Sequence, residues 1–107
     1  MSARKASPRT LRRAHARAVE KLADAREKLA RLEPGGAPER PIAIESASLV
    51  EVHARSLRCL RCDRSYRLDE HTAETVDGVR LRVAKMVCTA CGASRSVYFQ
   101  IAAPQMS

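Results

Sequence analysis

The four cysteines of this chain stand in two pairs with the same spacing. Cys59 and Cys62 form the first C-x-x-C pair, and Cys88 and Cys91 form the second. Two residues between cysteines allow a tight turn to point both sulfurs at one ion, and a tetrahedral Zn²⁺ takes four thiolates at about 2.3 Å. Because the two pairs use every cysteine, the sequence predicts one closed structural site in which all four hold one zinc ion.

A site closed by four thiolates leaves no coordination position for water or substrate. We therefore predict that the protein is not an enzyme, has no catalytic residues and takes no small-molecule substrate. Two other uses of the cysteines stay open. Four thiolates also suit iron, and a redox or zinc-sensing switch would release its metal when the thiolates are oxidised.

The N-terminal end carries basic residues but no apolar run after them. Secretory leaders and membrane spans need such a run, so we expect neither export nor a membrane partner. In a reducing compartment, cysteine pairs stay as thiols and bind metal rather than form disulfides. The expected location is cytoplasmic.

A long helix is expected from about Pro8 to Leu32. Ser7 is a good N-cap, and proline fits the first helical position. Apolar residues and one histidine then recur at alternating spacings of four and three, which places them on one side of a helix. We call this set the leucine stripe; it consists of Leu11, His15, Ala18, Leu22, Ala25, Leu29 and Leu32. Such a stripe suits a partner helix, a second copy of the chain or the face of a sheet.

Residues 34–41 are rich in proline and glycine and are predicted to form a linker that ends the helix. Beyond the linker, a β-hairpin is expected over 65–87, because Asp77-Gly78 is a two-residue turn of the kind that adopts positive φ. The other expected extended segments are 42–45, 49–57 and 95–101. The predicted units are a basic N-terminal helix in 1–33, the linker, a metal-binding domain in 42–101 and a tail in 102–107.

Residues 49–57 allow two interpretations. Val50, Val52 and Ala54 alternate with Glu51, His53 and Arg55, which favours a strand that leads into the first cysteine pair. A helix over Ser48 to Leu57 stays possible.

Two C-x-x-C pairs around a predicted hairpin, with Gly92 after the second pair and a closing strand, resemble a zinc ribbon over about residues 54–101. The spacing is similar to that of ribbons in transcription elongation factors and RNA polymerase subunits. The resemblance implies an antiparallel β zinc ribbon. With the helix expected at the N-terminal end, the predicted fold class is small α+β: a long N-terminal helix followed by the ribbon. Elongation-factor ribbons that stimulate transcript cleavage carry an Asp-Glu pair at the hairpin tip. In this chain Asp69-Glu70 lies on the first hairpin strand, so we do not assign it that role.

The formal net charge of +8 is concentrated in the N-terminal segment. Residues 1–33 contain ten Lys/Arg and four acids, whereas residues 34–107 contain ten Lys/Arg and eight acids. Four thiolates and one Zn²⁺ together carry about −2, which would bring the second part close to neutrality. The strongly basic element is therefore the N-terminal helix.

Clusters of lysine and arginine neutralise phosphates, so this helix and the first cysteine pair are expected to contact nucleic acid or a nucleic-acid-associated complex. The predicted contact residues are Arg4, Lys5, Arg9, Arg12, Arg13, Arg17, Arg61 and Arg64. Two other interpretations stay open. A merely solvated helical face would have the same composition, and a protein-interaction adaptor would use the leucine stripe to dimerise or to dock on a partner.

Overall fold

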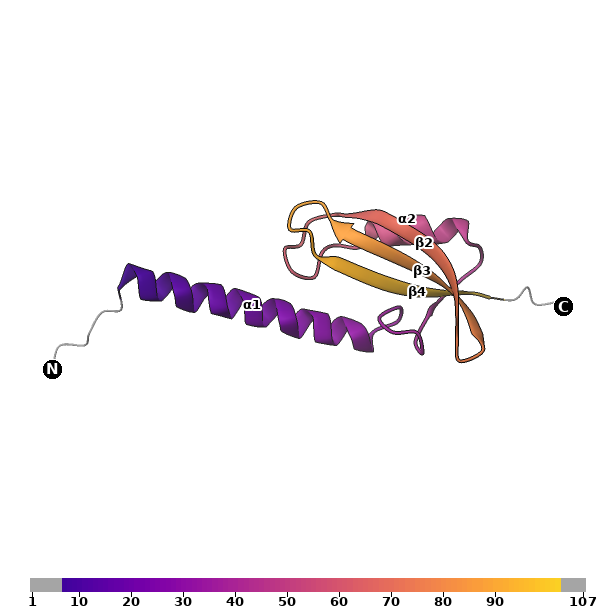
Figure 1. Ribbon diagram of the computed structural model, residues 1–107, viewed down its shortest axis with the longest axis horizontal. Helices are drawn as coiled ribbons and strands as arrows, with labels where there is room; N and C mark the ends of the chain where they lie inside the picture. Colours follow the sequence, from indigo (N-terminus) through magenta and orange to yellow (C-terminus); the bar gives the residue numbers. More distant parts are fainter. Residues whose placement is uncertain (1–6, 103–107) are drawn as a thin grey trace.

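The chain folds into one long helix, one short helix and a four-stranded sheet (Figure 1). The computed structural model describes residues 7–102. In chain order the elements are α1 (Pro8–Leu32), β1 (Ile42–Ile44), α2 (Ser48–Ser56), β2 (Tyr66–Val76), β3 (Val79–Cys88) and β4 (Ser94–Ile101). This is the small α+β fold that the sequence predicts.

Helix α1 begins and ends where the sequence predicts. The Ser7 side chain accepts a hydrogen bond from the Thr10 backbone N–H at 3.2 Å and so caps the first turn. The C-terminal half of α1 lies beside the sheet and its N-terminal half projects past it, so the molecule measures 77 × 24 × 23 Å (Figure 1). Within residues 7–102, no helix combines the length and the apolar composition needed to cross a membrane.

The sheet has the strand order β1-β4-β3-β2. Strands β2, β3 and β4 form an antiparallel meander, and the turn between β2 and β3 holds Asp77 and Gly78 at φ of 50° and 79°, as expected for this turn pair. The extended segment after the Pro/Gly residues is confirmed as β1. It joins β4 in parallel, with Ile42 opposite Phe99, so the antiparallel meander carries one parallel edge strand.

The predicted strand over residues 49–57 is wrong, because residues 48–56 form helix α2. The alternation of Val50 and Val52 suggested a strand. Val50 and Ala54, however, stand one helical turn apart, and both have exposed fractions of 0%. Burying this pair on one side of a helix outweighs the strand preference of the valines, which depends strongly on packing context.

The main core lies between α2 and one face of the sheet. Phe99 of β4 and Met86 of β3 are almost completely buried there together with Val50 of α2. The same cluster of packed side chains includes Cys59 and Cys88. The core therefore continues into both cysteine pairs, and the position of the sulfurs depends on the packing of the sheet.

The Pro/Gly segment between α1 and β1 is folded against the edge of the sheet. The Gly35 carbonyl accepts a hydrogen bond from the Tyr98 N–H at 2.9 Å, and the Arg40 side chain donates to the Arg31 carbonyl near the end of α1 at 2.8 Å. Gly35 has a φ of +86°, and a Cβ at this position would lie 2.6 Å from Ile42 Cδ1. Glycine alone satisfies both conditions without strain. The segment forms a packed corner that sets the direction of α1.

Candidate metal centre

The four cysteine sulfurs lie together at the end of the sheet where β3 stops and β4 starts. All four lie within 4.8 Å of one another. The sulfur–sulfur distance is 3.6 Å between Cys59 and Cys91 and 3.3 Å between Cys62 and Cys88. In a tetrahedron with metal–sulfur bonds of about 2.3 Å, neighbouring sulfurs are about 3.8 Å apart. The four predicted ligands are thus placed to hold one metal ion.

The first cysteine turn, residues 59–64, is closed by two backbone hydrogen bonds. The Cys59 carbonyl accepts from the Asp63 N–H at 2.9 Å, and the Cys59 N–H donates to the Arg64 carbonyl at 2.7 Å. Asp63 has a φ of 63°. Aspartate tolerates this left-handed conformation better than most residues, so the turn can close without glycine.

The second cysteine turn, residues 88–93, repeats this pattern position by position. The Cys88 carbonyl accepts from the Gly92 N–H at 3.1 Å, and the Cys88 N–H donates to the Ala93 carbonyl at 2.9 Å. Gly92 has a φ of 75° and occupies the place that Asp63 has in the first turn. Both pairs therefore present their sulfurs from the same backbone shape, which explains why they meet at one point.

Backbone N–H groups in the turns point at the sulfurs. Cys91 and Ala90 direct their N–H groups at Cys88 Sγ, at 3.5 and 3.4 Å, and together they lower the pKa of Cys88 to about 6. The Arg64 N–H favours ionisation of Cys62, but the sulfur of Cys88 and its neighbours outweigh it and raise the pKa of Cys62 to about 12. The sulfurs thus lie so close together that negative charge on one thiolate opposes ionisation of the next. A divalent cation would stabilise all four thiolates at once and leave a net charge of only about −2, so the donor set fits a metal ion.

Two further contacts hold the cysteine turns to the sheet and to each other. Tyr66 is 6% exposed, and its hydroxyl oxygen accepts a hydrogen bond from the Leu60 N–H at 3.2 Å. The N–H and the hydroxyl of Thr89 donate to the Ser65 carbonyl at 3.2 and 3.1 Å. Tyr66 belongs to β2 and Ser65 immediately precedes it, so this strand positions both turns.

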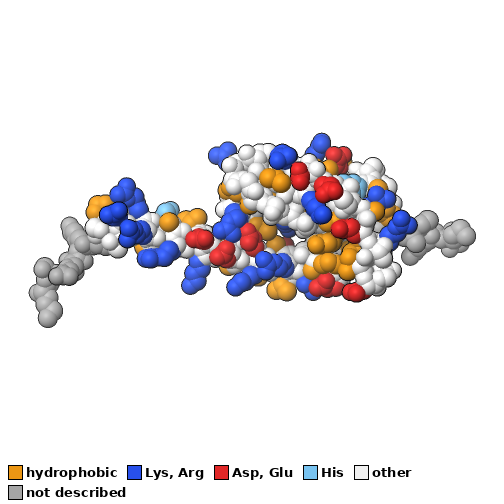
Figure 2. All heavy atoms as spheres, viewed as in Figure 1, with side chains coloured by type: hydrophobic (Ala, Val, Ile, Leu, Met, Phe, Trp, Pro, Cys, Tyr) orange, Lys and Arg blue, Asp and Glu red, His pale blue; other side chains and the backbone are white. Residues whose placement is uncertain are grey.

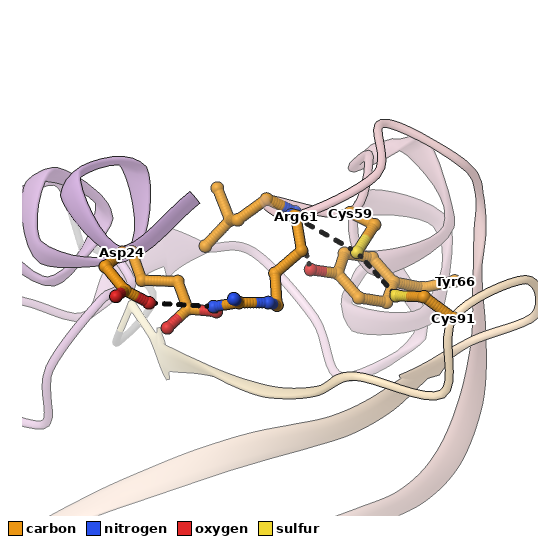
Figure 3. Close-up of polar contacts among 7 residues, drawn as sticks. Asp24, Cys59, Arg61, Tyr66 and Cys91 are labelled. Carbon is orange, nitrogen blue, oxygen red and sulfur yellow. Dashed lines mark hydrogen bonds and ion pairs between the residues drawn. The ribbon is translucent and has the colours of Figure 1, made fainter. Parts of the chain in front are cut away.

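Arg61, between the first two cysteines, holds helix α1 against the metal centre (Figure 3). Its side chain points away from the sulfurs, and one guanidinium nitrogen lies 3.1 Å from a carboxylate oxygen of Asp24 and 2.9 Å from one of Glu27. Arg26 lies 3.8 Å from Asp63 and adds a weaker ion pair between the same two elements. Sequence reasoning missed this junction. The only available signal was that Asp24 and Glu27 lie one helical turn apart in a helix whose first half is basic.

The predicted nucleic-acid contacts fall into three groups. Those on the projecting part of α1 have exposed side chains, and we call residues 8–21 the basic arm. Figure 2 shows blue side chains gathered on the arm and red ones where α1 reaches the sheet. In the first cysteine turn, Arg61 is engaged with α1, whereas Arg64 is exposed. The arm carries Arg9, Arg12, Arg13 and Arg17, while Arg4 and Lys5 lie outside the described residues.

The Asp69-Glu70 pair lies on β2, away from the hairpin turn, as expected. Asp69 pairs with Arg67 at 3.7 Å, and Glu70 pairs with Lys85 on β3 at 3.9 Å. All four side chains are well exposed. Such ion pairs are typical of a solvated sheet surface.

Comparison of the chain with protein-family models, with curated proteins and with solved structures found no match.

Proposed function

We propose that this protein is a non-catalytic structural-zinc module whose basic arm contacts nucleic acid. In this proposal Cys59, Cys62, Cys88 and Cys91 hold one Zn²⁺, and the ion supplies cross-linking of the two cysteine turns. Four protein ligands fill a tetrahedral site, so a substrate has no position at the metal. The end of the sheet that carries the four cysteines then serves as a rigid base from which α1 projects.

The observation that carries the proposal is a row of cations on the basic arm. Arg9, Arg13, Arg17 and Lys21 stand four residues apart and all have exposed side chains. At a rise of 1.5 Å per residue, successive cations of the row are about 6 Å apart along the helix axis. The row is long enough to meet several phosphates of one nucleic-acid strand.

The arm is also unfavourable as an isolated helix, which supports a binding role. There is no acidic residue in its first turn, and Glu20 is the first acid in the helix. Cations near the positive end of the helix dipole repel it and one another. Phosphates would relieve this repulsion, and the cations of the arm would in turn displace counterions condensed on the nucleic acid, whose release favours binding.

The experiment that tests the proposal is a binding titration on the zinc-loaded chain. Fluorescently labelled 20-nucleotide RNA and 20-base-pair DNA serve as probes, and anisotropy gives the Kd at low salt. The variant Arg9→Gln/Arg13→Gln/Arg17→Gln should bind at least about tenfold more weakly, because each phosphate contact contributes to affinity.

The matched control is Arg55→Gln/Arg67→Gln/Arg80→Gln, which removes the same charge from exposed positions of α2, β2 and the hairpin. Its Kd should stay within about threefold of the unmodified chain, since only the long-range field changes. The nucleic-acid proposal fails if neither probe binds at low salt. The assignment to the arm fails if the two variants weaken binding equally.

A further inference from the structure

The leucine stripe of α1 is uncovered along its whole length. All seven of its residues are exposed, and the exposed fraction is 59% for Leu11, 62% for Leu22 and 60% for Leu29. The side of α1 that turns toward the sheet is a different one, on which Ala23 and Ala30 are buried. A continuous apolar stripe left in water on a soluble helix marks an interaction surface.

The spacing of the stripe fits a second helix. Its residues follow a heptad pattern, with His15, Leu22 and Leu29 at positions a and the others at positions d. Alanines at two of the d positions allow close approach of a partner backbone. The stripe is narrow, as in a helix–helix seam, and it is a poor match for phosphates, which need cations and donors rather than leucine.

Cations stand on both sides of this stripe. Lys21 and Lys28 occupy g positions on the side that faces away from the sheet. On the other side Arg12 and Arg26 occupy e positions, where Arg26 also lies 3.8 Å from Asp63, and Glu33 takes the last e position. Residues at e and g meet the flanks of the partner helix and decide which partner is accepted. The charge pattern therefore favours a partner helix with carboxylates at its e and g positions.

A second copy of the chain does not satisfy this pattern. In an antiparallel pair of α1 helices that overlap along most of their length, g meets g and e meets e, so Lys21 of each copy would face Lys28 of the other, while Arg12 would face Glu33. In a parallel pair, Lys21 of one copy would meet Arg26 of the other. The one attractive pair in that arrangement would be Lys28 with Glu33, at the very end of the helix. Like charges at these positions disfavour self-pairing.

We propose that the leucine stripe docks an amphipathic helix of another protein, with apolar residues at its a and d positions and glutamate or aspartate at its e and g positions. The partner's leucines would cover Leu22 and Leu29, and its acids would pair with Lys21 and Lys28. Arg9, Arg13 and Arg17 lie on a different side of α1 from the stripe, so these three cations can contact phosphates while the stripe is occupied, whereas Lys21 borders both surfaces. This inference does not depend on the nucleic-acid proposal.

The test uses a synthetic peptide of four heptads with leucine at a and d and glutamate at e and g, titrated into the zinc-loaded full chain by calorimetry. Repulsion between its own glutamates keeps the peptide from pairing with itself. We expect binding that weakens at least tenfold in Leu22→Gln/Leu29→Gln. Both side chains are exposed, so the variant should keep the circular dichroism spectrum of the original chain.

Three controls make the outcome decisive. Leu49→Gln/Val52→Gln changes two exposed apolar side chains of α2 and should leave the peptide Kd unchanged. The same peptide with lysine at e and g should not bind. A peptide that keeps the glutamates but lacks the leucines should not bind either. Sedimentation of the chain alone should show a monomer.

Any of four results would overturn the proposal. The acidic peptide fails to bind, or it binds Leu22→Gln/Leu29→Gln as tightly as the original chain. The chain forms a dimer that this double variant abolishes, which assigns the stripe to a second copy. The chain binds vesicles of phosphatidylcholine and phosphatidylserine through the stripe but does not bind the peptide, and this result assigns the stripe to a lipid surface.

Discussion

The cysteine end of the sheet and the basic arm of α1 treat charge and apolar surface in opposite ways. At the cysteine end, Arg61 lies within ion-pair distance of two carboxylates, and Cys59 and Cys88 are buried in the core. On the arm, Arg9, Arg13 and Arg17 precede the first acid of the helix, Glu20, and Leu11 is largely exposed. The same 25-residue helix belongs to both regions.

This difference separates what the fold needs from what it leaves available. At the cysteine end, the side chains of Arg61, Tyr66 and Thr89 have hydrogen-bond partners within the chain, which is typical of a structural site. Among residues 7–102, no acid forms an ion pair with the cations of the arm, and the leucine stripe of α1 is exposed. Neither feature stabilises the molecule alone. Residues with no local stabilising role are the better indicators of what the protein binds.

Removing the metal should give the largest effect and would break the comparison at its stable end. Chelation, or the Cys59→Ser substitution, should lower Tm by about 20 °C or more, because structural metal binding is part of the folding free energy of small domains. Thermal unfolding by circular dichroism and elemental analysis for one metal per chain measure this. Thr89→Val, which keeps all four sulfurs and removes one hydrogen bond to Ser65, should lower Tm by only a few degrees. A metal-free chain that melts at the original temperature would refute the structural role.

A smaller effect is expected at the corner that joins the two regions. Gly35→Ala should lower the free energy of unfolding by about 2–3 kcal/mol, from the strain of positive φ plus the clash with Ile42 and Val97. Gly78→Ala is the matched control. Its φ of +79° is similar, but no atom lies within 4 Å of the added Cβ, so about 1 kcal/mol is expected. Urea unfolding of the zinc-loaded chain measures both, and equal losses would show that packing at the corner contributes nothing.

The smallest effect should come from the junction at Arg61, and it sharpens where the two regions meet. Arg61→Gln removes the contacts to Asp24 and Glu27, so amide exchange should accelerate in residues 23–30 while the metal content stays at one per chain. Arg64→Gln, an exposed arginine of the same turn, should leave exchange in α1 unchanged. If Arg61→Gln also releases metal, the residue supports the metal centre itself. If exchange does not change, α1 is held by other contacts.

The parts that the sequence predicted correctly are those encoded by residues close together in the chain. Helix α1 follows from the Ser7 cap and from a regular spacing of apolar residues, and the hairpin turn follows from Asp77-Gly78. The cysteine cluster joins distant residues, but the spacing within each pair predicts it, because two C-x-x-C pairs are typical of a metal site.

The parts that could not be predicted depend on contacts between distant segments. Val50 and Val52 alternate as in a strand. The segment is helical because a helix lets Val50 and Ala54 pack together against the sheet face. Arg61 stands among other arginines in the sequence, and its meeting with Asp24 requires the corner at Gly35 to fold α1 back along the sheet. The local propensities of the residues do not determine such long-range contacts.

The salt dependence of nucleic-acid binding tests the central claim most directly. The claim is that the cysteine end is a structural base and the basic arm is the binding surface. The logarithm of the association constant is plotted against the logarithm of salt concentration for the zinc-loaded chain and for Arg9→Gln/Arg13→Gln/Arg17→Gln. Each lost phosphate contact on duplex DNA reduces the slope by about 0.9. We predict a slope smaller by about 2–3 in the arm variant and little changed in Arg55→Gln/Arg67→Gln/Arg80→Gln. An arm variant with the original slope would contradict the account.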